Sequence, residues 1–251
     1  MIKFTNVSKS FTDDAGQVNA LINNLNVEFK KGEFTMIIGA NGSGKSTMLN
    51  LIAGLTLPDN GSIILDDIEV QKLKSYERSA FIARLFQNPL QGTVADLIVL
   101  ENMRLAYLRN TSKGLKLGID AAFKSKVKEA IAELNLGLEN KLAQKMGTLS
   151  GGQRQALTLV MATLCDAKVL LMDEPTAALD PKSANSLMEN ANKLISNSNI
   201  CTIMVTHNMR EAVNYGNRLL MLKEGKVMRD LNTLEKSSID SNSLTNWLYE
   251  A

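Results

Sequence analysis

The sequence predicts an α/β fold, because short apolar runs of strand length alternate with segments of helical spacing. Residues 34–38 form an apolar, partly β-branched run that enters a glycine-rich loop, and residues 46–55 then place apolar side chains at helical intervals. Two later apolar runs, residues 169–172 and 200–205, are separated by a helical stretch over residues 183–195. These observations predict a mixed sheet core built from two βα-like parts.

The N-terminal part predicts an antiparallel β region. Residues 2–7 and 25–29 alternate apolar with polar side chains, and a turn over residues 31–33 precedes the next apolar run. Residues 58–61, Pro-Asp-Asn-Gly, are a second turn signal, so residues 62–65 are expected to form another strand.

The middle of the chain predicts a helical insert. Phe123, Val127, Ile131 and Leu134 recur at helical spacing, while charged side chains occupy the remaining faces. Such charges are typical of a solvated surface, and a partner-binding role is the alternative. We expect one domain over residues 1–251, with a core from residues 1–91 and 166–251 and a helical subdomain over residues 92–165.

Composition excludes several classes of protein. The chain has 251 residues, 45% of them hydrophobic, which is enough for a sizeable core. Its 28 basic and 26 acidic residues give a net charge of +2, which argues against a nucleic-acid partner. No apolar run reaches the length of a membrane span, and residues 1–11 lack an apolar signal region, so we expect an unexported protein. Cys165 and Cys201 lie in apolar runs and are expected to be buried thiols.

Residues 39–46 match the phosphate-loop pattern G-x-x-x-x-G-K-S between the predicted strand and helix. Glycines let successive amide groups face phosphate oxygens, the following helix adds its positive end, Lys45 adds a cation, and the Ser46 hydroxyl can ligate magnesium. A glycine-rich connector without a ligand is the alternative. The predicted nucleotide contacts are Gly39, Asn41, Gly42, Ser43, Gly44, Lys45, Ser46 and Thr47.

The apolar run over residues 169–172 delivers two carboxylates, Asp173 and Glu174. Taken alone, this pattern is equally typical of a strand that leaves the core. Beside a phosphate loop, Asp173 can hold magnesium through water, and Glu174 can polarise the water that attacks the γ-phosphate. His207, the one histidine, follows the apolar run 200–205 and is either structural or faces the ligand crevice at the end of a strand.

The segment Leu149-Ser-Gly-Gly-Gln153 precedes an apolar helix. Together with the phosphate loop, the strand carboxylates and the late histidine, it resembles the ATP-binding cassette (ABC) ATPases. The resemblance implies a P-loop NTPase of the ABC type in which two copies pair head to tail, with each ATP between the phosphate loop of one copy and the signature segment of the other. A helix N-terminus of this composition is a second anion cradle. The implied contacts are Ser150, Gly151, Gly152 and Gln153.

Three more positions match family residues. Phe11 is similar to the aromatic that stacks on adenine, although an ordinary packing Phe is the alternative. Gln87 resembles the glutamine that senses magnesium and water and links to the transmembrane partner. Asp180, followed by Pro181, resembles the loop that crosses the dimer interface, or is simply a helix cap.

The chain departs from the family pattern directly after the signature. Where many members carry a second arginine and small residues, Arg154 and Gln155 lead into the apolar run 156–164. This does not affect the phosphate cradle, but it leaves open how the helix packs.

The resemblance implies an ATP-hydrolysing transporter subunit that uses ATP and Mg²⁺, with Glu174, His207 and Gln87 in catalysis and Ser46, Gln87 and Asp173 at the metal. It further implies a homodimer or a paired cassette, separate transmembrane permease subunits, a solute-binding protein, and a cytoplasmic position on the inner face of the membrane. A short, unfused cassette favours an importer, and a weaker similarity to tryptophan or tyrosine uptake cassettes favours an amino acid. The alternatives are a soluble ATPase that serves a scaffold such as iron–sulfur cluster maturation, and an exporter or lipoprotein-release cassette.

Overall fold

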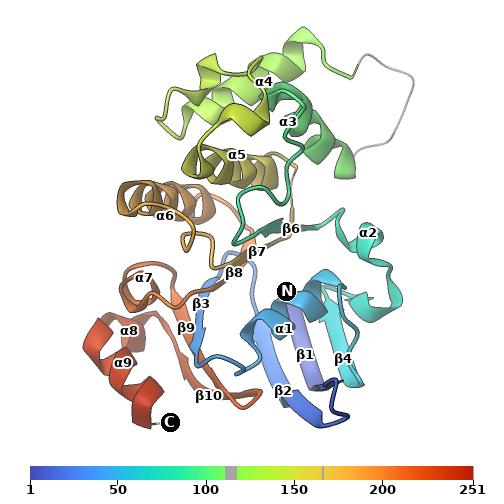
Figure 1. Cartoon of the computed structure of the whole chain (residues 1–251), viewed down its shortest axis with the longest axis vertical. Helices are drawn as coiled ribbons and strands as arrows, with labels where there is room; N and C mark the ends of the chain where they lie inside the picture. The colour runs from blue at the N-terminus through green and yellow to red at the C-terminus, as the bar shows by residue number, and fades with distance from the viewer. Residues whose placement is uncertain (111–117, 166, 251) are drawn as a thin grey trace. The chain divides into compact units, whose positions relative to one another are not determined.

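A computed structural model describes residues 1–110, 118–165 and 167–250 (Figure 1). The chain divides into two compact units: a first unit of Met1–Ser79 with Ser198–Ala251, and a second unit of Ala80–Asn197. Part of the predicted helical subdomain, residues 111–117, lies outside the described residues, and the predicted boundaries at residues 92 and 165 stay a prediction.

The N-terminal strands of the first unit form an antiparallel sheet in the order β2-β1-β4-β5 (Figure 1). Strand β1 pairs with β2 in a register that places Ile2 opposite Phe29 and Phe4 opposite Val27. The alternating apolar side chains of β1 are buried, which is why the period of two was visible in the sequence. The strands are β1 (Ile2–Thr12), β2 (Val18–Phe29), β4 (Asn60–Leu65) and β5 (Ile68–Glu69).

A second group of strands in the first unit surrounds β3, which is parallel to both β8 and β9, while β10 is antiparallel to β9. Every residue of β3 is buried, so its sequence is mostly apolar, with Thr35 as the polar exception, rather than alternating. The sheet is therefore mixed, and the predicted fold class is confirmed. The strands are β3 (Phe34–Gly39), β8 (Cys201–Val205), β9 (Arg218–Lys223) and β10 (Lys226–Leu231).

Helix α1 (Lys45–Ala53) follows β3 through the glycine-rich loop. It ends before the predicted limit at residue 55, because Gly54 adopts a left-handed conformation with φ of 78° and caps the helix. The remaining helices of the first unit are η1 (Val70–Lys72), α2 (Ser75–Arg78), α7 (Met209–Asn214), α8 (Thr233–Ser237) and α9 (Ser241–Glu250).

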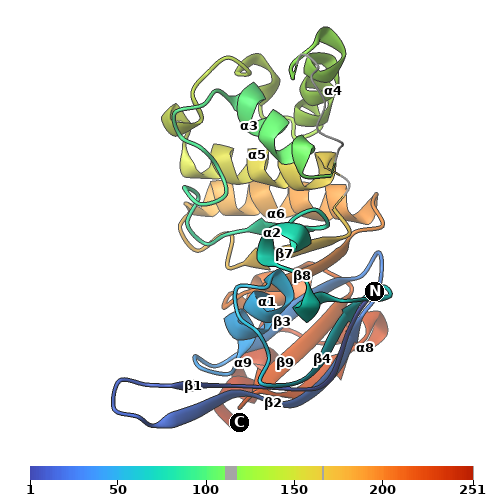
Figure 2. The ribbon, with the colours of Figure 1, turned by 90° about the vertical axis from the view of Figure 1, so that its right-hand side faces the viewer.

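The second unit contains two parallel strands, β6 (Ile82–Leu85) and β7 (Val169–Asp173), and a group of helices. Figure 2 shows α5 and α6 running side by side, with α3 and α4 on the other face of α5. The helices are α3 (Val99–Tyr107), η2 (Leu108–Asn110), α4 (Ala121–Ala132), η3 (Leu138–Asn140), η4 (Met146–Thr148), α5 (Gly151–Leu164) and α6 (Pro181–Ser196).

The predicted apolar face of α4 is buried in a core shared with α3 and α5. Phe123, Val127 and Ile131 belong to this core, and Leu134 joins it just after the helix ends. Helix α5 is buried around most of its circumference, because it packs against helices on more than one side. That packing accounts for the apolar run after the signature.

The predicted state of both cysteines is confirmed. Cys165 and Cys201 are free and buried, and burial raises the pKa of the Cys201 thiol to about 12. In the described ranges, no helix combines the length and apolar character that a membrane span requires.

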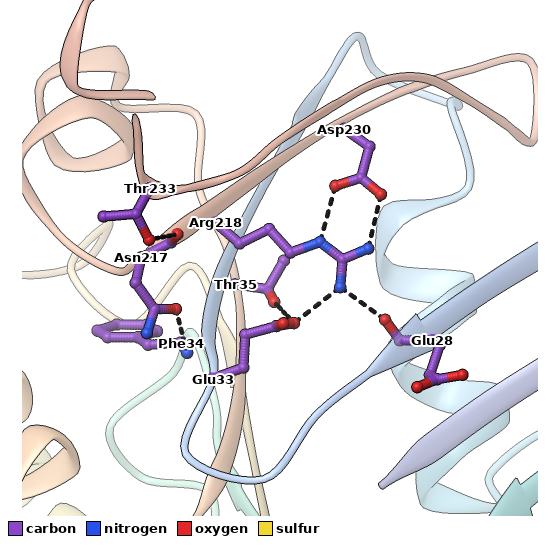
Figure 3. A network of polar contacts seen from close by, with 8 residues as sticks. All are labelled: Glu28, Glu33, Phe34, Thr35, Asn217, Arg218, Asp230 and Thr233. Atoms are coloured by element: carbon purple, nitrogen blue, oxygen red, sulfur yellow. Dashed lines mark hydrogen bonds and ion pairs between the residues drawn. The ribbon is translucent and has the colours of Figure 1, made fainter. Parts of the chain in front are cut away.

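A polar network centred on Arg218 connects the two groups of strands in the first unit (Figure 3). Its guanidinium forms a two-point ion pair with Asp230 of β10, at 2.7 and 2.6 Å. A third nitrogen donates to Glu33 Oε1 at 2.8 Å and to the backbone carbonyl of Glu28 in β2 at 2.6 Å. The bonds to Asp230, and then those to Glu33, raise the pKa of Arg218 further above its usual range.

Replacing Arg218 with Ala is expected to lower the free energy of unfolding by about 2 to 3 kcal/mol, because it leaves the mostly buried Glu33 carboxylate without its cation. Urea unfolding of the variant and the wild type measures this loss. Arg210→Ala, which removes an exposed guanidinium from α7, is the matched control. Equal stability of the two variants would show that the network contributes little.

Candidate functional site

The phosphate loop lies between β3 and α1, as the sequence predicts. Lys45 is 6% exposed, and its Nζ donates to the backbone carbonyls of Gly39 and Ala40, both at 2.8 Å. Gly42 and Gly44 have φ of 78° and 98°, a region that glycine enters at little cost. The Lys45 ammonium therefore bonds to the first two residues of the loop, and the curvature of the loop depends on glycine. Both lie at the N-terminal, positive end of α1.

The turn between β9 and β10 supports this loop from outside. Glu224 and Gly225 have φ of 48° and 73°, the pattern of a type I′ hairpin turn. The Gly225 amide donates to the Ser43 carbonyl at 3.2 Å, and its carbonyl accepts from the Asn23 amide at 3.1 Å. A Cβ on Gly225 would lie 2.7 Å from the Leu21 carbonyl oxygen. Three backbone segments therefore meet at a position where only glycine fits.

Phe11 and His207 also belong to the first unit. Phe11 is 40% exposed near the end of β1, and the Lys9 ammonium lies 5.2 Å from the centre of its ring. His207 is exposed two residues after the end of β8. The backbone beside it is fixed, because the buried Thr206 hydroxyl donates to Glu211 at 2.7 Å and accepts from the Asn208 amide at 3.0 Å. Both rings are accessible to a ligand.

The second unit carries the two carboxylates at the end of β7. Asp173 forms an ion pair with Arg84 of β6, with 3.0 Å between the guanidinium and Oδ2. Glu174 has φ of 46°, a left-handed conformation that is strained for a residue of this type. Such strain is concentrated at functional sites, because the surrounding structure must hold it. The conformation of Glu174 therefore favours function over an incidental strand end.

The signature segment begins α5 with a reciprocal cap. The Ser150 hydroxyl accepts from the Gln153 amide at 3.3 Å, and the Gln153 side chain accepts from the Ser150 amide at 3.2 Å. A Cβ on Gly151 would lie 3.3 Å from the Leu179 side chain, and one on Gly152 would lie 2.8 Å from the Ser183 side chain. The two glycines thus allow the segment that contains Asp180 to approach the start of α5.

Gln87 and Asp180 lie in loops of the same unit. Gln87 is exposed just after β6, and the Pro89 ring behind it would lie 3.4 Å from a Cβ on Gly151. Asp180 caps α6, with Oδ1 accepting from the amides of residues 182 and 183, both at 3.1 Å. Hydrogen bonds from the Ser183 hydroxyl and amide lower the pKa of Asp180. The cap is therefore observed, while its part in a dimer interface stays a prediction.

The structure places the predicted residues in two sets. The first unit carries Phe11, the phosphate loop and His207. The second unit brings together Gln87, residues 150–153, the two carboxylates and Asp180. Three residues that the sequence analysis did not assign also contact these segments: Arg84, Gln155 and Gly225.

The fold and the phosphate loop define a nucleotide-binding protein of the P-loop class. A family model for ABC transporters matches residues 22–177. The chain is 41% identical over 242 residues to the tyrosine transport ATP-binding protein of Clostridioides difficile (strain R20291), with 95% of each chain covered. It is 32% identical over 234 residues to the phosphonates import ATP-binding protein PhnC of Lactococcus lactis subsp. lactis (strain IL1403), with 92% of each covered.

Solved structures of ATP-binding cassettes are similar to this chain as well. The dimeric post-hydrolysis state of the ATP-binding cassette MJ0796, bound to ADP and Pi, has a TM-score of 0.78 and 30% identity, with 93% of this chain and 99% of that chain covered. The cassette MJ1267 in its ADP conformation has a TM-score of 0.80 at 24% identity, which supports the fold. The chain therefore belongs to the ABC transporter family and is an ATP-binding cassette with ATPase activity.

Replacing Gly225 with Ala is expected to raise the Kd for ATP about tenfold, because the added Cβ forces the hairpin turn away from the Ser43 carbonyl. Titration with a fluorescent ATP analogue measures the change. Gly32→Ala is the control, since Gly32 has a similar φ of 69° and nothing within 4 Å of its Cβ position. Both variants should lose about 1 kcal/mol of stability through backbone strain, and Gly225→Ala should lose more because its Cβ meets the backbone of β2. Equal ATP affinity in both would contradict support of the loop by this turn.

Proposed function

We propose that the chain is the ATP-hydrolysing subunit of a membrane importer for a small solute, with an amino acid as the favoured solute class. The observation that carries this proposal is the 41% identity to a tyrosine transport ATP-binding protein across 95% of both chains. The second relative is also an import protein by name. Because selectivity in such systems lies outside the cassette, the solute class rests on relatedness alone.

Binding of ATP is assigned first to the phosphate loop. The amides of the glycine-rich loop and the Lys45 ammonium are proposed to bind the phosphates, and the exposed ring of Phe11 is proposed to stack on adenine. Ser46, Asp173 and Gln87 offer hydroxyl, carboxylate and carboxamide oxygens, a donor set that fits Mg²⁺. When held by these residues, Mg²⁺ would supply positive charge that offsets the charge of the phosphates.

Hydrolysis is assigned to Glu174. Its carboxylate accepts a proton from water as the water oxygen attacks the γ-phosphorus, and the bond to the bridging oxygen breaks to leave ADP and phosphate. Gln87 can orient the water, because its amide both donates and accepts. His207, which is exposed beyond the end of β8, is proposed to contact the γ-phosphate.

Two copies of the chain, or this chain with a paired cassette, are proposed to close head to tail around two ATP molecules. Residues 150–153 offer two glycines and a helix N-terminus, which complete an anion site that the other copy begins. ATP binding closes the pair, and hydrolysis opens it. The structurally similar cassette MJ0796 is dimeric.

The proposed partners are permease subunits that span the membrane and a solute-binding protein, which places this chain on the inner face of the cell membrane. Gln87 and the helical part of the second unit are the proposed contact with the permease. Nucleic acid is not a proposed partner, given the net charge of +2.

The test is to express the chain at its natural locus with an affinity tag and to purify it from solubilised membranes. A polytopic permease should co-purify in a fixed ratio, and vesicles that contain the complex should take up a labelled aromatic amino acid when ATP is present on the cassette side. Recovery with soluble scaffold proteins alone would overturn the transport function, and ATP-driven efflux would overturn the direction.

A further inference from the structure

The side chain of Gln155 lies inside the second unit, between two loops that carry proposed site residues. It projects from the second turn of α5 and is 2% exposed. Its Nε2 donates to the backbone carbonyl of Phe86 at 2.6 Å and to that of Pro175 at 3.3 Å. Phe86 directly precedes Gln87, and Pro175 directly follows Glu174. One amide group therefore holds the backbone next to each of these residues.

The chemistry of this position calls for glutamine. A carboxamide nitrogen carries two hydrogens in one plane, so it can serve two carbonyl oxygens without bringing a charge into the interior. A carboxylate of the same shape would place an acceptor against two acceptors. An apolar side chain would leave both carbonyls without this donor, at a cost of about 1 to 3 kcal/mol for each that finds no other.

Other contacts near Gln155 connect the C-terminal ends of β6 and β7. Leu85 of β6 pairs with Met172 of β7, so the loops that follow leave the sheet side by side. Arg84 pairs with Asp173 at 3.0 Å, and its guanidinium lies 4.9 Å from the centre of the Phe86 ring. Arg84 thus contacts the Phe86 ring, whereas the Gln155 amide holds the Phe86 carbonyl, so a Gln155 variant removes the second contact and leaves the first.

We infer that Gln155 is a positioning residue that sets the location of Glu174 relative to Gln87 and ties both to the signature segment on its own helix. This inference rests on the proposed catalytic role of Glu174. A displacement at Gln87, the proposed contact with the permease, is passed through the Gln155 amide to the residue after Glu174. The link thereby couples the state of the partner to the rate of hydrolysis.

The expected kinetic signature is a lower kcat with an unchanged KM for ATP. ATP is proposed to be held mainly by the phosphate loop, which belongs to the first unit, whereas the Gln155 amide bonds to two carbonyls of the second unit. Misplacing a catalytic group by about 1 Å can reduce a rate by roughly 100-fold. We therefore expect kcat to fall roughly 10- to 100-fold in variants that lose the two donated bonds.

The experiment measures steady-state ATP hydrolysis by the full chain as wild type, Gln155→Glu and Gln155→Met. Gln155→Glu keeps the shape and removes the donors, and Gln155→Met keeps the length and stays neutral. Thr158→Val is the control, because Thr158 is a buried polar residue of the same helix whose hydroxyl donates to the Arg154 carbonyl of that helix. Stoichiometric titration with a fluorescent ATP analogue gives the folded, binding-competent fraction to which each kcat is normalised.

Both Gln155 variants should show the lower kcat with wild-type KM, and Thr158→Val should match the wild type. The inference is overturned if normalised kcat equals that of Thr158→Val, or if KM rises while kcat is unchanged. Glu174→Gln is assayed in parallel. If Glu174→Gln is inactive while the Gln155 variants are normal, only the inference fails; if Glu174→Gln turns over normally, the proposed catalytic role fails and the inference with it.

Discussion

Replacing Glu174 with Gln is expected to slow ATP turnover roughly 100- to 10,000-fold while ATP still binds. The substitution keeps the size and shape of the side chain but removes the group that takes the proton from the attacking water. Because the backbone at residue 174 has φ of 46°, an isosteric variant also avoids adding a new steric demand at a strained position. Binding is retained, since the phosphate loop lies in the other unit.

Two measurements check this expectation. Steady-state phosphate release gives kcat, and light scattering during gel filtration in ATP reports whether the variant accumulates as a dimer that the wild type resolves by hydrolysis. Glu189→Gln removes the same charge from an exposed position on α6 and should behave as the wild type. Unchanged turnover in Glu174→Gln would refute its role as the base, and slow turnover without a stable dimer would argue against hydrolysis as the step that opens the pair.

Local features of this fold were predictable because local chemistry determines them. The phosphate loop needs glycines, a lysine and a helix start in sequence, and all of them lie within residues 39–46. The buried face of α4 follows from side chains at helical intervals. Helix α1 ends earlier than predicted because Gly54 adopts a left-handed conformation. The spacing of apolar residues, on which the prediction rested, carries no information about this cap.

Contacts between distant segments were not predictable, because nothing near a residue in the sequence identifies its partner. The partner of the Gln155 amide is a backbone carbonyl 69 residues away, and every residue presents such a carbonyl. Arg84 pairs with Asp173, 89 residues away, and nothing in the sequence distinguishes Arg84 from the other basic residues as the partner of this carboxylate. The irregular part of β1 and β2 was also missed: register shifts between Phe4 and Ser10 break the period of two on which strand prediction depends.

Replacing Lys45 with Ala is expected to raise the Kd for ATP roughly 10- to 100-fold, the equivalent of losing one charge-assisted hydrogen bond of about 1.5 to 3 kcal/mol. The ammonium now bonds to the carbonyls of Gly39 and Ala40, at 2.8 Å each, so the variant removes both a cation for the phosphates and a brace across the loop. Lys45→Met separates the loss of the ammonium, with its charge and its two donated bonds, from the loss of packing, because it keeps most of the buried aliphatic stem.

Calorimetric titration of ATP into each variant gives the Kd directly, and thermal unfolding without nucleotide gives the cost to the loop itself. If the ammonium dominates, Lys45→Met should bind ATP as weakly as Lys45→Ala and be the more stable of the two. Lys3→Ala, which removes an exposed ammonium from β1, should leave the Kd unchanged. An unaltered Kd in both Lys45 variants would remove this residue from the phosphate site. Recovery of wild-type affinity in Lys45→Met alone would instead assign the effect to packing, because that variant restores the stem without the charge.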